Sequence, residues 1–303
     1  MDPRDRAIGG LLGLALGDAL GAPFAGRRAH DVPGSLPAFE LPWNGSPAGS
    51  TTDATAMARL LVGSLSELGR FDADDVARRF VSWIATDPPS VDALTRRVLL
   101  VLRDGDPDAA RAYVEQRGPE VSAGNGSVRS CAPLGVAYAH RPGDLGIHAP
   151  ALSAITHWDE RCRTACLAIT LTTAALVRGV SPHAAVLGAV GATLDREGGE
   201  ELEFLVEAAG HARPVDGPDA SFCLFTAGLA LRTAVEADGV EAGLRSVVAL
   251  GGETAANAAV AGALLGARDG LSGLPGPWLD RLADREEIER EAAGLAALAE
   301  RLP

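Results

Sequence analysis

Residues 251–267 read GGETAANAAVAGALLGA, a polar cluster that opens a long apolar stretch. Residues 50–57, which read STTDATAM, begin a second apolar stretch in the same way. Carboxylate, hydroxyl and amide oxygens are the ligand types that Mg²⁺ prefers. In both stretches, however, alanine stands among these oxygen-bearing side chains. The two stretches are far apart in the chain, so only the fold can bring these two helix starts together.

Stripes of small residues run along two of the predicted helices. The first stripe, in the helix predicted over Asp5–Leu20, contains Gly9, Gly13, Gly17 and Gly21. The second follows the first quoted stretch and contains Ala258, Gly262, Gly266 and Gly270. Each glycine inside a helix costs about 1 kcal/mol relative to alanine. Close packing of backbones offsets such a cost, so we expect these two helices to touch or to lie against the same central element.

The remaining long segments also have helical patterns. They are Thr52–Leu68, Asp72–Ala85, Ser90–Arg103, Cys162–Arg178, Pro182–Leu194, Glu200–His211, Phe222–Glu236, Val240–Leu250 and Arg285–Arg301. The connections are rich in glycine and proline, and no clear alternating strand pattern occurs. The sequence therefore predicts an all-α fold, with residues 1–303 forming a single compact multi-helix domain.

Composition limits the partners of this chain. Hydrophobic residues make up 47% and aromatic residues only 4%, so the core must consist mainly of Ala, Leu and Val. The net charge is −13 and every basic side chain other than histidine is an arginine. Such an acidic chain repels phosphate backbones at long range, which argues against nucleic-acid binding. A small phosphorylated ligand held by backbone N–H groups stays compatible with this charge.

The cysteines and the N-terminus favour a cytoplasmic protein. Four cysteines occur, without the spacing of a disulfide framework: Cys131, Cys162, Cys166 and Cys223. Buried structural thiols explain them better than a metal pair does. The apolar run Ile8–Leu16 follows Asp2 and Asp5, whereas a signal peptide begins with basic residues. No run approaches the length expected of a membrane span, so we predict no membrane partner.

Four motifs in order carry a family resemblance. Besides the two quoted stretches, residues 17–24 read GDALGAPF, and residues 122–129 read SAGNGSVR with the sequence THWD following at 156–159. Their order and spacing resemble the ADP-ribosylglycohydrolase family over nearly the whole chain, from about Arg6 to Leu282. This resemblance implies a compact all-α fold with two Mg²⁺ ions in a central cleft. It also implies cleavage of the bond between ADP-ribose and an acceptor, so that a small ADP-ribosyl or nucleotide ligand, or an ADP-ribosylated protein, is the expected partner.

The resemblance identifies a reduced metal site. Thr52, Asp53 and Glu253 match metal-ligand positions and keep oxygen. Three matching positions hold alanine and have lost it: Ala54, Ala255 and Ala256. Two adjacent dications need several carboxylates to offset their mutual repulsion, and Mg²⁺ demands nearly octahedral oxygen geometry. We therefore expect at most one weakly bound Mg²⁺.

Carboxylates alone can support an oxocarbenium-like transition state in other glycosidases. Asp53, Glu253 and Asp18 are the candidate catalytic residues here, provided that they converge. Asp18 is also explained by a supporting role at a helix end.

The loop that begins at Ser122 is the candidate ligand-binding element. Consecutive small residues expose backbone N–H groups, which suits a diphosphate. The candidate ligand-binding residues are Ser122, Gly124, Asn125, Gly126, Arg129 and His157. The role of Arg129 and His157 is implied by the resemblance, and Trp158 either stacks on a base or fills the core.

Three functions stay open. The first is a divergent glycohydrolase acting on an ADP-ribosyl or related nucleotide conjugate, with little or no dependence on metal. The second is an inactive pseudoenzyme that still binds ADP-ribose or a related nucleotide. The third is a structural protein that uses only the fold, which the preserved loop at residues 122–126 disfavours.

Overall fold

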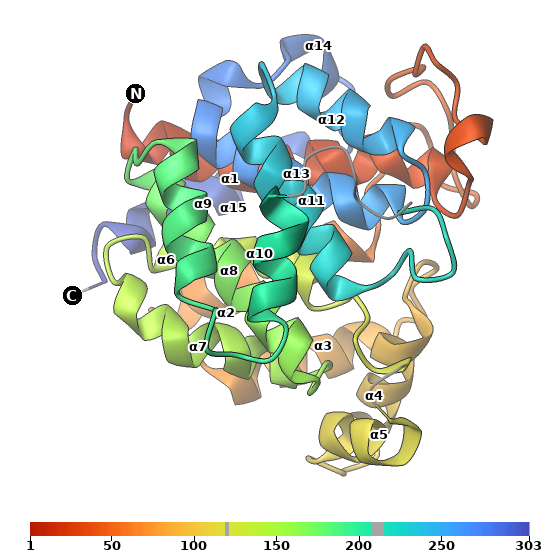
Figure 1. The fold of residues 1–303 in the computed structure, drawn as a ribbon, viewed down its shortest axis with the longest axis vertical. Helices are drawn as coiled ribbons and strands as arrows, with labels where there is room; N and C mark the ends of the chain where they lie inside the picture. The colour runs from red at the N-terminus through yellow and green to blue at the C-terminus, as the bar shows by residue number, and fades with distance from the viewer. Residues whose placement is uncertain (119–120, 208–214, 303) are drawn as a thin grey trace.

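The computed structural model describes residues 1–118, 121–207 and 215–302 (Figure 1). The α-helices are α1 (Pro3–Gly21), α2 (Asp53–Leu68), α3 (Ala73–Ile84), α4 (Ala93–Arg103), α5 (Ala109–Arg117), α6 (Ala132–Ala137), α7 (Pro142–Ala154), α8 (Glu160–Val177), α9 (Pro182–Gly191), α10 (Gly199–Glu207), α11 (Cys223–Glu236), α12 (Val240–Ala249), α13 (Thr254–Asp269), α14 (Gly276–Leu279) and α15 (Arg285–Ala299). Within the described ranges, β-structure is limited to isolated bridges. The predicted all-α fold is thus confirmed.

Helices α1 and α13 lie against each other along the two predicted stripes, and Figure 1 shows them crossing the middle of the molecule. A Cβ atom added at Gly13 would overlap the carbonyl oxygen of Gly262. A Cβ atom added at Gly17 would overlap that of Ala258 in the same way. The two backbones therefore approach too closely for any side chain larger than hydrogen at these glycines. The expected contact between the stripes is confirmed, and it offsets the low helix propensity of glycine.

The N-terminal helix is more apolar than the sequence analysis allowed. Together with η1 (Ala22–Phe24) it forms a segment, Pro3–Phe24, that is long and apolar enough to cross a membrane. The expectation that no run approaches this length is therefore wrong. In the folded protein 89% of its most apolar window is buried. Its hydrophobicity is explained by its place in the core, where α13 and α15 also cover it.

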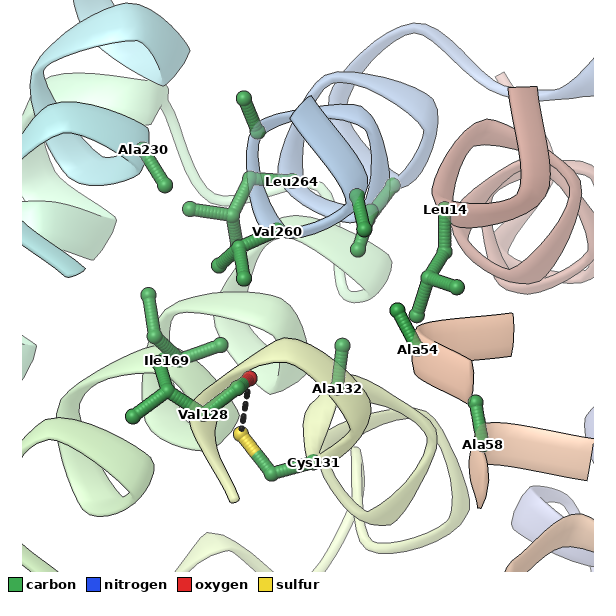
Figure 2. Packing of buried hydrophobic residues seen from close by; sticks show 14 of the residues in the cluster. Leu14, Ala54, Ala58, Val128, Cys131, Ala132, Ile169, Ala230, Val260 and Leu264 are labelled. Carbon is green, nitrogen blue, oxygen red and sulfur yellow. Dashed lines mark hydrogen bonds between the residues drawn. The ribbon is translucent and has the colours of Figure 1, made fainter. Parts of the chain in front are cut away.

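One hydrophobic cluster extends through most of the described helices, with α8, α11 and α13 at its centre. Figure 2 shows Leu14 of α1 beside Ala54 of α2, and Val260 and Leu264 of α13 between α1 and α11. Ala54 is fully buried in this cluster. A position that the resemblance assigns to a metal ligand has therefore become part of the core.

Several predicted helix boundaries shift by a few residues because the cap residues lie outside the helix. Thr52 and Asp92, for example, are N-caps whose side chains accept hydrogen bonds from backbone N–H groups of α2 and α4. The end of the predicted helix Glu200–His211 lies outside the described residues after Glu207. Four helices were not predicted: α5, α6, α7 and α14. Three of them are short, and α7 contains proline at Pro150, which usually indicates a break.

Candidate active site

The start of α2, the start of α4 and the turn η4 (Val128–Ser130) meet at one arginine. The Arg129 Nη2 atom donates to Asp53 Oδ2 and to Asp92 Oδ2, both at 2.5 Å. Glu253, at the start of α13, and Asp18 also act electrostatically on this guanidinium. The fold therefore gathers four carboxylates around one buried cation. We call Asp18, Asp53, Asp92, Arg129 and Glu253 the Arg129 cluster.

Asp18 supports the cluster from behind. Its carboxylate is fully buried and accepts hydrogen bonds from the backbone N–H and hydroxyl groups of Thr52 and Thr55, at 2.6–3.1 Å. Burial raises the pKa of Asp18 above its ordinary value, against the effect of these four bonds. Both oxygens of Asp18 are thus engaged in joining α1 to α2.

Asp53 and Asp92 share the guanidinium but differ in acidity. The side chain of Asp53 is 3% exposed, and burial raises its pKa to about 6 although Arg129 lowers it. The side chain of Asp92 is 32% exposed. Burial raises its pKa too, but Arg129 and the cap bond from the Thr95 N–H outweigh burial and bring it to about 2. Near neutral pH, Asp92 is therefore the firmly ionised member of the pair.

Glu253 is the half-buried N-cap residue of α13, and its side chain accepts no cap bond. The turn before it is fixed in place. The Gly252 N–H donates to the Arg27 carbonyl at 2.7 Å, and the Gly26 N–H donates to the Gly252 carbonyl at 2.8 Å. Gly251 and Gly252 both have positive φ values, which favour glycine. These backbone contacts, with the hydrogen bond from the Thr254 hydroxyl to the Gly21 carbonyl at 2.7 Å, place Glu253 next to the end of α1.

The predicted ligand loop lies beside the cluster, and its polar side chains are used to hold it. The Ser122 hydroxyl donates to the Gly118 carbonyl and to Asp159 at 2.8 and 3.0 Å. The Asn125 side-chain amide donates to the Thr226 hydroxyl at 3.0 Å. These two side chains therefore shape the loop.

Gly124 and Gly126 leave space in the loop for their neighbours. A Cβ atom at Gly126 would lie 2.5 Å from the His157 ring, 2.8 Å from the Thr95 hydroxyl and 2.9 Å from Asp92 Oδ2. At Gly124 it would lie 3.4 Å from His157 Nε2. The loop thus presents backbone, and no side chain, at both positions.

His157 completes the site. Its side chain is 1% exposed, and its Nδ1 atom lies 2.9 Å from the Thr156 hydroxyl. Its Nε2 atom is buried without a hydrogen-bond partner among the described residues. Burial lowers the pKa of His157 to about 4, so the ring is neutral at physiological pH. A buried, unpaired ring nitrogen facing a glycine loop is a candidate for a ligand contact.

A cavity of about 770 Å³ opens at the outer side of the loop. Val121, Gly124, Arg161, Phe222 and Phe225 are among its lining residues. Arg161 lies 5.6 Å from the centre of the Phe222 ring, and the Phe222 and Phe225 rings meet edge to face. Aromatic faces next to a glycine-rich loop can receive a base while the loop receives phosphate.

The buried thiols lie beneath this loop. Cys162 Sγ lies 3.2 Å from the Gly124 carbonyl, and Cys166 Sγ lies 3.5 Å from the Ser127 hydroxyl. Burial raises the pKa of Cys131 and of Cys162 well above the ordinary thiol value. All four cysteines are free and buried, as expected of structural thiols, and Cys162 and Cys166 support the loop from α8.

The oxygen donors that a metal pair would need are sparse. No group of three or more His, Cys, Asp or Glu side chains with metal-binding geometry occurs in the described part of the chain. Ala54 and Ala256 are buried and Ala255 is half-buried, so three positions matched to metal ligands offer no side-chain oxygen. The Asp53 carboxylate is already paired with a cation.

Asp92 is the functional candidate that the sequence analysis missed. It appears in the sequence as an ordinary N-cap, three residues before Thr95 at the start of an amphipathic helix. The signal that could have identified it is its place beside Arg129, and this depends on the fold.

Comparisons with known proteins support the fold. The profile of a family described as ADP-ribosylglycohydrolase matches residues 1–303. The ADP-ribosyl-(dinitrogen reductase) glycohydrolase of Rhodospirillum rubrum is 29% identical over 97% of this chain and 97% of its own length. ADP-ribosylarginine hydrolase Tri1 of Pseudomonas putida is 25% identical over 96% of this chain and 78% of its own. A solved structure titled "ADP-ribosylglycohydrolase-related protein complex" aligns with a TM-score of 0.83 and 32% identity, and covers 98% of this chain and 99% of that one.

Proposed function

Because the chain belongs to the ADP-ribosylglycohydrolase family, we propose that it hydrolyses a ribosidic bond of an ADP-ribosyl conjugate with little or no help from metal. The observation that carries this proposal is the bridge from Arg129 to Asp53 and Asp92. It supplies, from the chain itself, a cation that holds two carboxylates together beside a ligand loop.

The loop and His157 are the proposed ligand-binding elements. In this proposal the backbone at Gly124 and Gly126 binds the diphosphate. The His157 Nε2 atom, which has no hydrogen-bond partner among the described residues, supplies a polar contact beside it. The cavity next to Phe222 accepts the base. The ribose would then extend from the loop towards Asp92, which packs against Gly126.

The chemistry proposed for the carboxylates follows from their exposure. Asp92, ionised and one-third exposed, stabilises positive charge on the ribosyl ring as the bond to the leaving group breaks. Glu253 orients the water whose oxygen bonds to the anomeric carbon, and one proton of that water goes to the leaving atom. Asp53 is a positioning residue in this scheme because it holds Arg129 against Asp92. Asp18 in turn holds the Thr52 end of α2.

The side-chain oxygens at the matched ligand positions do not fit the pair of Mg²⁺ ions that the family implies, and the proposed reaction does not involve a metal ion. Thr52, predicted as a ligand, donates its hydroxyl to Asp18. Asp53 and Glu253 interact electrostatically with the Arg129 guanidinium, and the positive charge of that group repels a dication. We therefore keep the expectation of at most one weakly bound ion.

The second candidate is a pseudoenzyme that binds ADP-ribose. Asp53 is buried and paired, and three alanines stand at former ligand positions, which favours loss of catalysis with retention of the loop. Relatives named for hydrolysis of ADP-ribosylarginine and of ADP-ribosyl-dinitrogen reductase supply the substrates to test.

The test uses ADP-ribosylarginine with EDTA present, and chromatography measures the ADP-ribose released. We expect product from the wild-type chain and its loss in Asp92→Asn and Glu253→Gln. Asp87→Asn is the matched control, because Asp87 is an exposed carboxylate outside the cluster. Thermal shift with ADP-ribose is measured on the same proteins, since a ligand at a hundred times its Kd stabilises by about 2.7 kcal/mol.

The outcomes separate the candidates. Release of product in EDTA supports the proposed hydrolase. A thermal shift without product, with and without Mg²⁺, supports the pseudoenzyme. Product that appears only when Mg²⁺ is added contradicts the metal-independent scheme. If ADP-ribose causes no thermal shift and no product is released, only a structural role is left.

A further inference from the structure

A second groove lies between α3, the end of α4 and α7. Its volume is about 850 Å³, and none of its lining residues belongs to the Arg129 cluster. Its floor consists of small and aliphatic side chains from all three helices, among them Ala77, Leu102 and Ala154. Trp158 closes one end and is 40% exposed. The tryptophan therefore does not fill the core, which was one of its two interpretations from sequence.

Arginines surround this floor. Arg78, Arg103 and Arg163 line the groove, whereas Asp74 is the one acidic residue among the described lining residues. Arg163 also lies over the Trp158 ring at 5.3 Å. Three arginines therefore line the groove against one aspartate, although the chain as a whole has a net charge of −13.

The arginines are paired only with nearby residues of their own segments. Arg78 contacts Asp75 at 3.2 Å, Arg103 contacts Asp104 at 3.1 Å, and Arg163 contacts Glu160 at 2.6 Å. The exposed fractions of the three arginine side chains are 68%, 47% and 29%, in the same order. Ion pairs at such exposure contribute about 0–1 kcal/mol. Each guanidinium has five N–H donors, so it can donate to a second carboxylate while it keeps its present partner.

The distribution of polar groups favours a protein over a small molecule. Small-molecule sites converge a few polar groups on a largely enclosed ligand. Here the arginine side chains are partly exposed, and most of the other lining side chains are small or aliphatic. The aromatic lining residue is a tryptophan, and the basic lining residues are arginines. These two residue types are enriched at the centres of protein interfaces.

From these observations we infer that the groove between α3, α4 and α7 docks an acidic, amphipathic segment of a partner protein. Apolar side chains of that segment lie on the floor against Trp158, and its carboxylates pair with Arg78 and Arg103. This inference goes beyond the proposed function and does not depend on it, since the groove shares no lining residue with the cavity beside Phe222 or with the Arg129 cluster. Helix α4 connects the two, with Asp92 at its N-cap and Arg103 at its last turn.

The probe is a fluorescein-labelled peptide of fourteen residues with Glu and Leu at helical spacing, titrated with the full chain while anisotropy is recorded. We expect saturable binding that weakens with salt. Trp158→Ala and Arg103→Glu should each weaken binding roughly tenfold, which corresponds to about 1.4 kcal/mol. Arg111→Glu is the matched control, because Arg111 is an equally exposed arginine on α5 outside the groove. It should change the Kd by less than about twofold.

A peptide with Lys in place of every Glu tests the charge. Equal binding of the two peptides, or no binding of the acidic one, overturns the inference. A dimer in light scattering that Arg103→Glu dissociates would also overturn it, in favour of a second copy of this chain. The thermal shift with ADP-ribose should be unchanged in Arg103→Glu, so a failure here is distinguishable from a failure of the proposed function.

Discussion

The contact between α1 and α13 and the Arg129 cluster are both built where helices meet, and they tolerate change very differently. Along the contact, Gly13 and Gly17 face backbone atoms that cannot move away. Beside the cluster, three positions that the resemblance matches to metal ligands hold Ala54, Ala255 and Ala256, in the first turns of helices that start at Asp53 and Thr254.

The difference shows which interactions maintain the fold. Alanine is the best helix former, so replacing a carboxylate in the first turn of a helix removes chemistry without disturbing the helix. No comparable replacement exists for a glycine that touches backbone on all sides. The site can therefore diverge while the frame stays fixed.

The largest expected effect is at the helix contact. Gly17→Leu should destabilise the protein by about 4 kcal/mol or more, because the side chain must separate α1 from α13. Urea denaturation, or the soluble yield if the variant does not fold, measures this. Gly188→Ala in α9 is the control: nothing lies near its added Cβ, and we expect a gain of about 0.5–1 kcal/mol. A Gly17→Leu variant as stable as wild type would show that the contact between α1 and α13 does tolerate a large side chain.

A smaller effect is expected at the centre of the site. Arg129→Met should cost about 3 kcal/mol, since it leaves Asp53 and Asp92 without their shared cation. Arg111→Met removes an exposed arginine from an i,i+4 pair and should cost less than about 0.5 kcal/mol. If both variants lose equally little free energy of unfolding, Arg129 is not the residue that organises the cluster.

A third effect depends on pH. Burial raises the pKa of Asp53 to about 6, so the folded state favours its protonated form. The stability gained in this way is complete in acid, below the ordinary Asp pKa, and is lost as the pH rises through about 6. Relative to Asp53→Asn, the free energy of unfolding of wild type should therefore fall by about 1–3 kcal/mol between pH 4 and pH 7.

Urea unfolding of the two proteins at several pH values gives this difference. His157, whose pKa burial lowers to about 4, contributes in the opposite direction: its stability is present above the ordinary His pKa and is lost as the pH falls through about 4. That contribution is common to wild type and variant, and cancels. A difference that is flat with pH would mean that Asp53 titrates at its ordinary value.

The frame was more predictable from the sequence than the site. A four-residue spacing of glycine predicts a face of a helix directly, so the pattern indicated that the two stripes touch or share a central element. The fold then brings Gly13 against Gly262. Patterns along a single segment also indicated most long helices. They failed at α7, where Pro150 obscures the helical period, and at short helices such as α14.

The site depends on contacts between segments, which a local pattern does not contain. The sequence placed Asp18 among the catalytic candidates, because carboxylates can support an oxocarbenium-like transition state, and left a supporting role at a helix end open. The fold supplies Thr52 and Thr55 as partners and thereby occupies it. Asp92 was not among the candidates, because nothing in the local pattern of the predicted helix Ser90–Arg103 indicates its contact with Arg129.

We propose that the Arg129 guanidinium, and not a metal pair, organises the carboxylates at these helix starts. Calorimetric titration of the metal-free wild-type chain with Mg²⁺, at neutral pH and with ADP-ribose absent and then present, tests it most directly. The account predicts no saturable heat, or a single ion with a Kd above about 1 mM, equivalent to less than about 4.1 kcal/mol of binding free energy. Two ions per chain bound at micromolar concentration would contradict it.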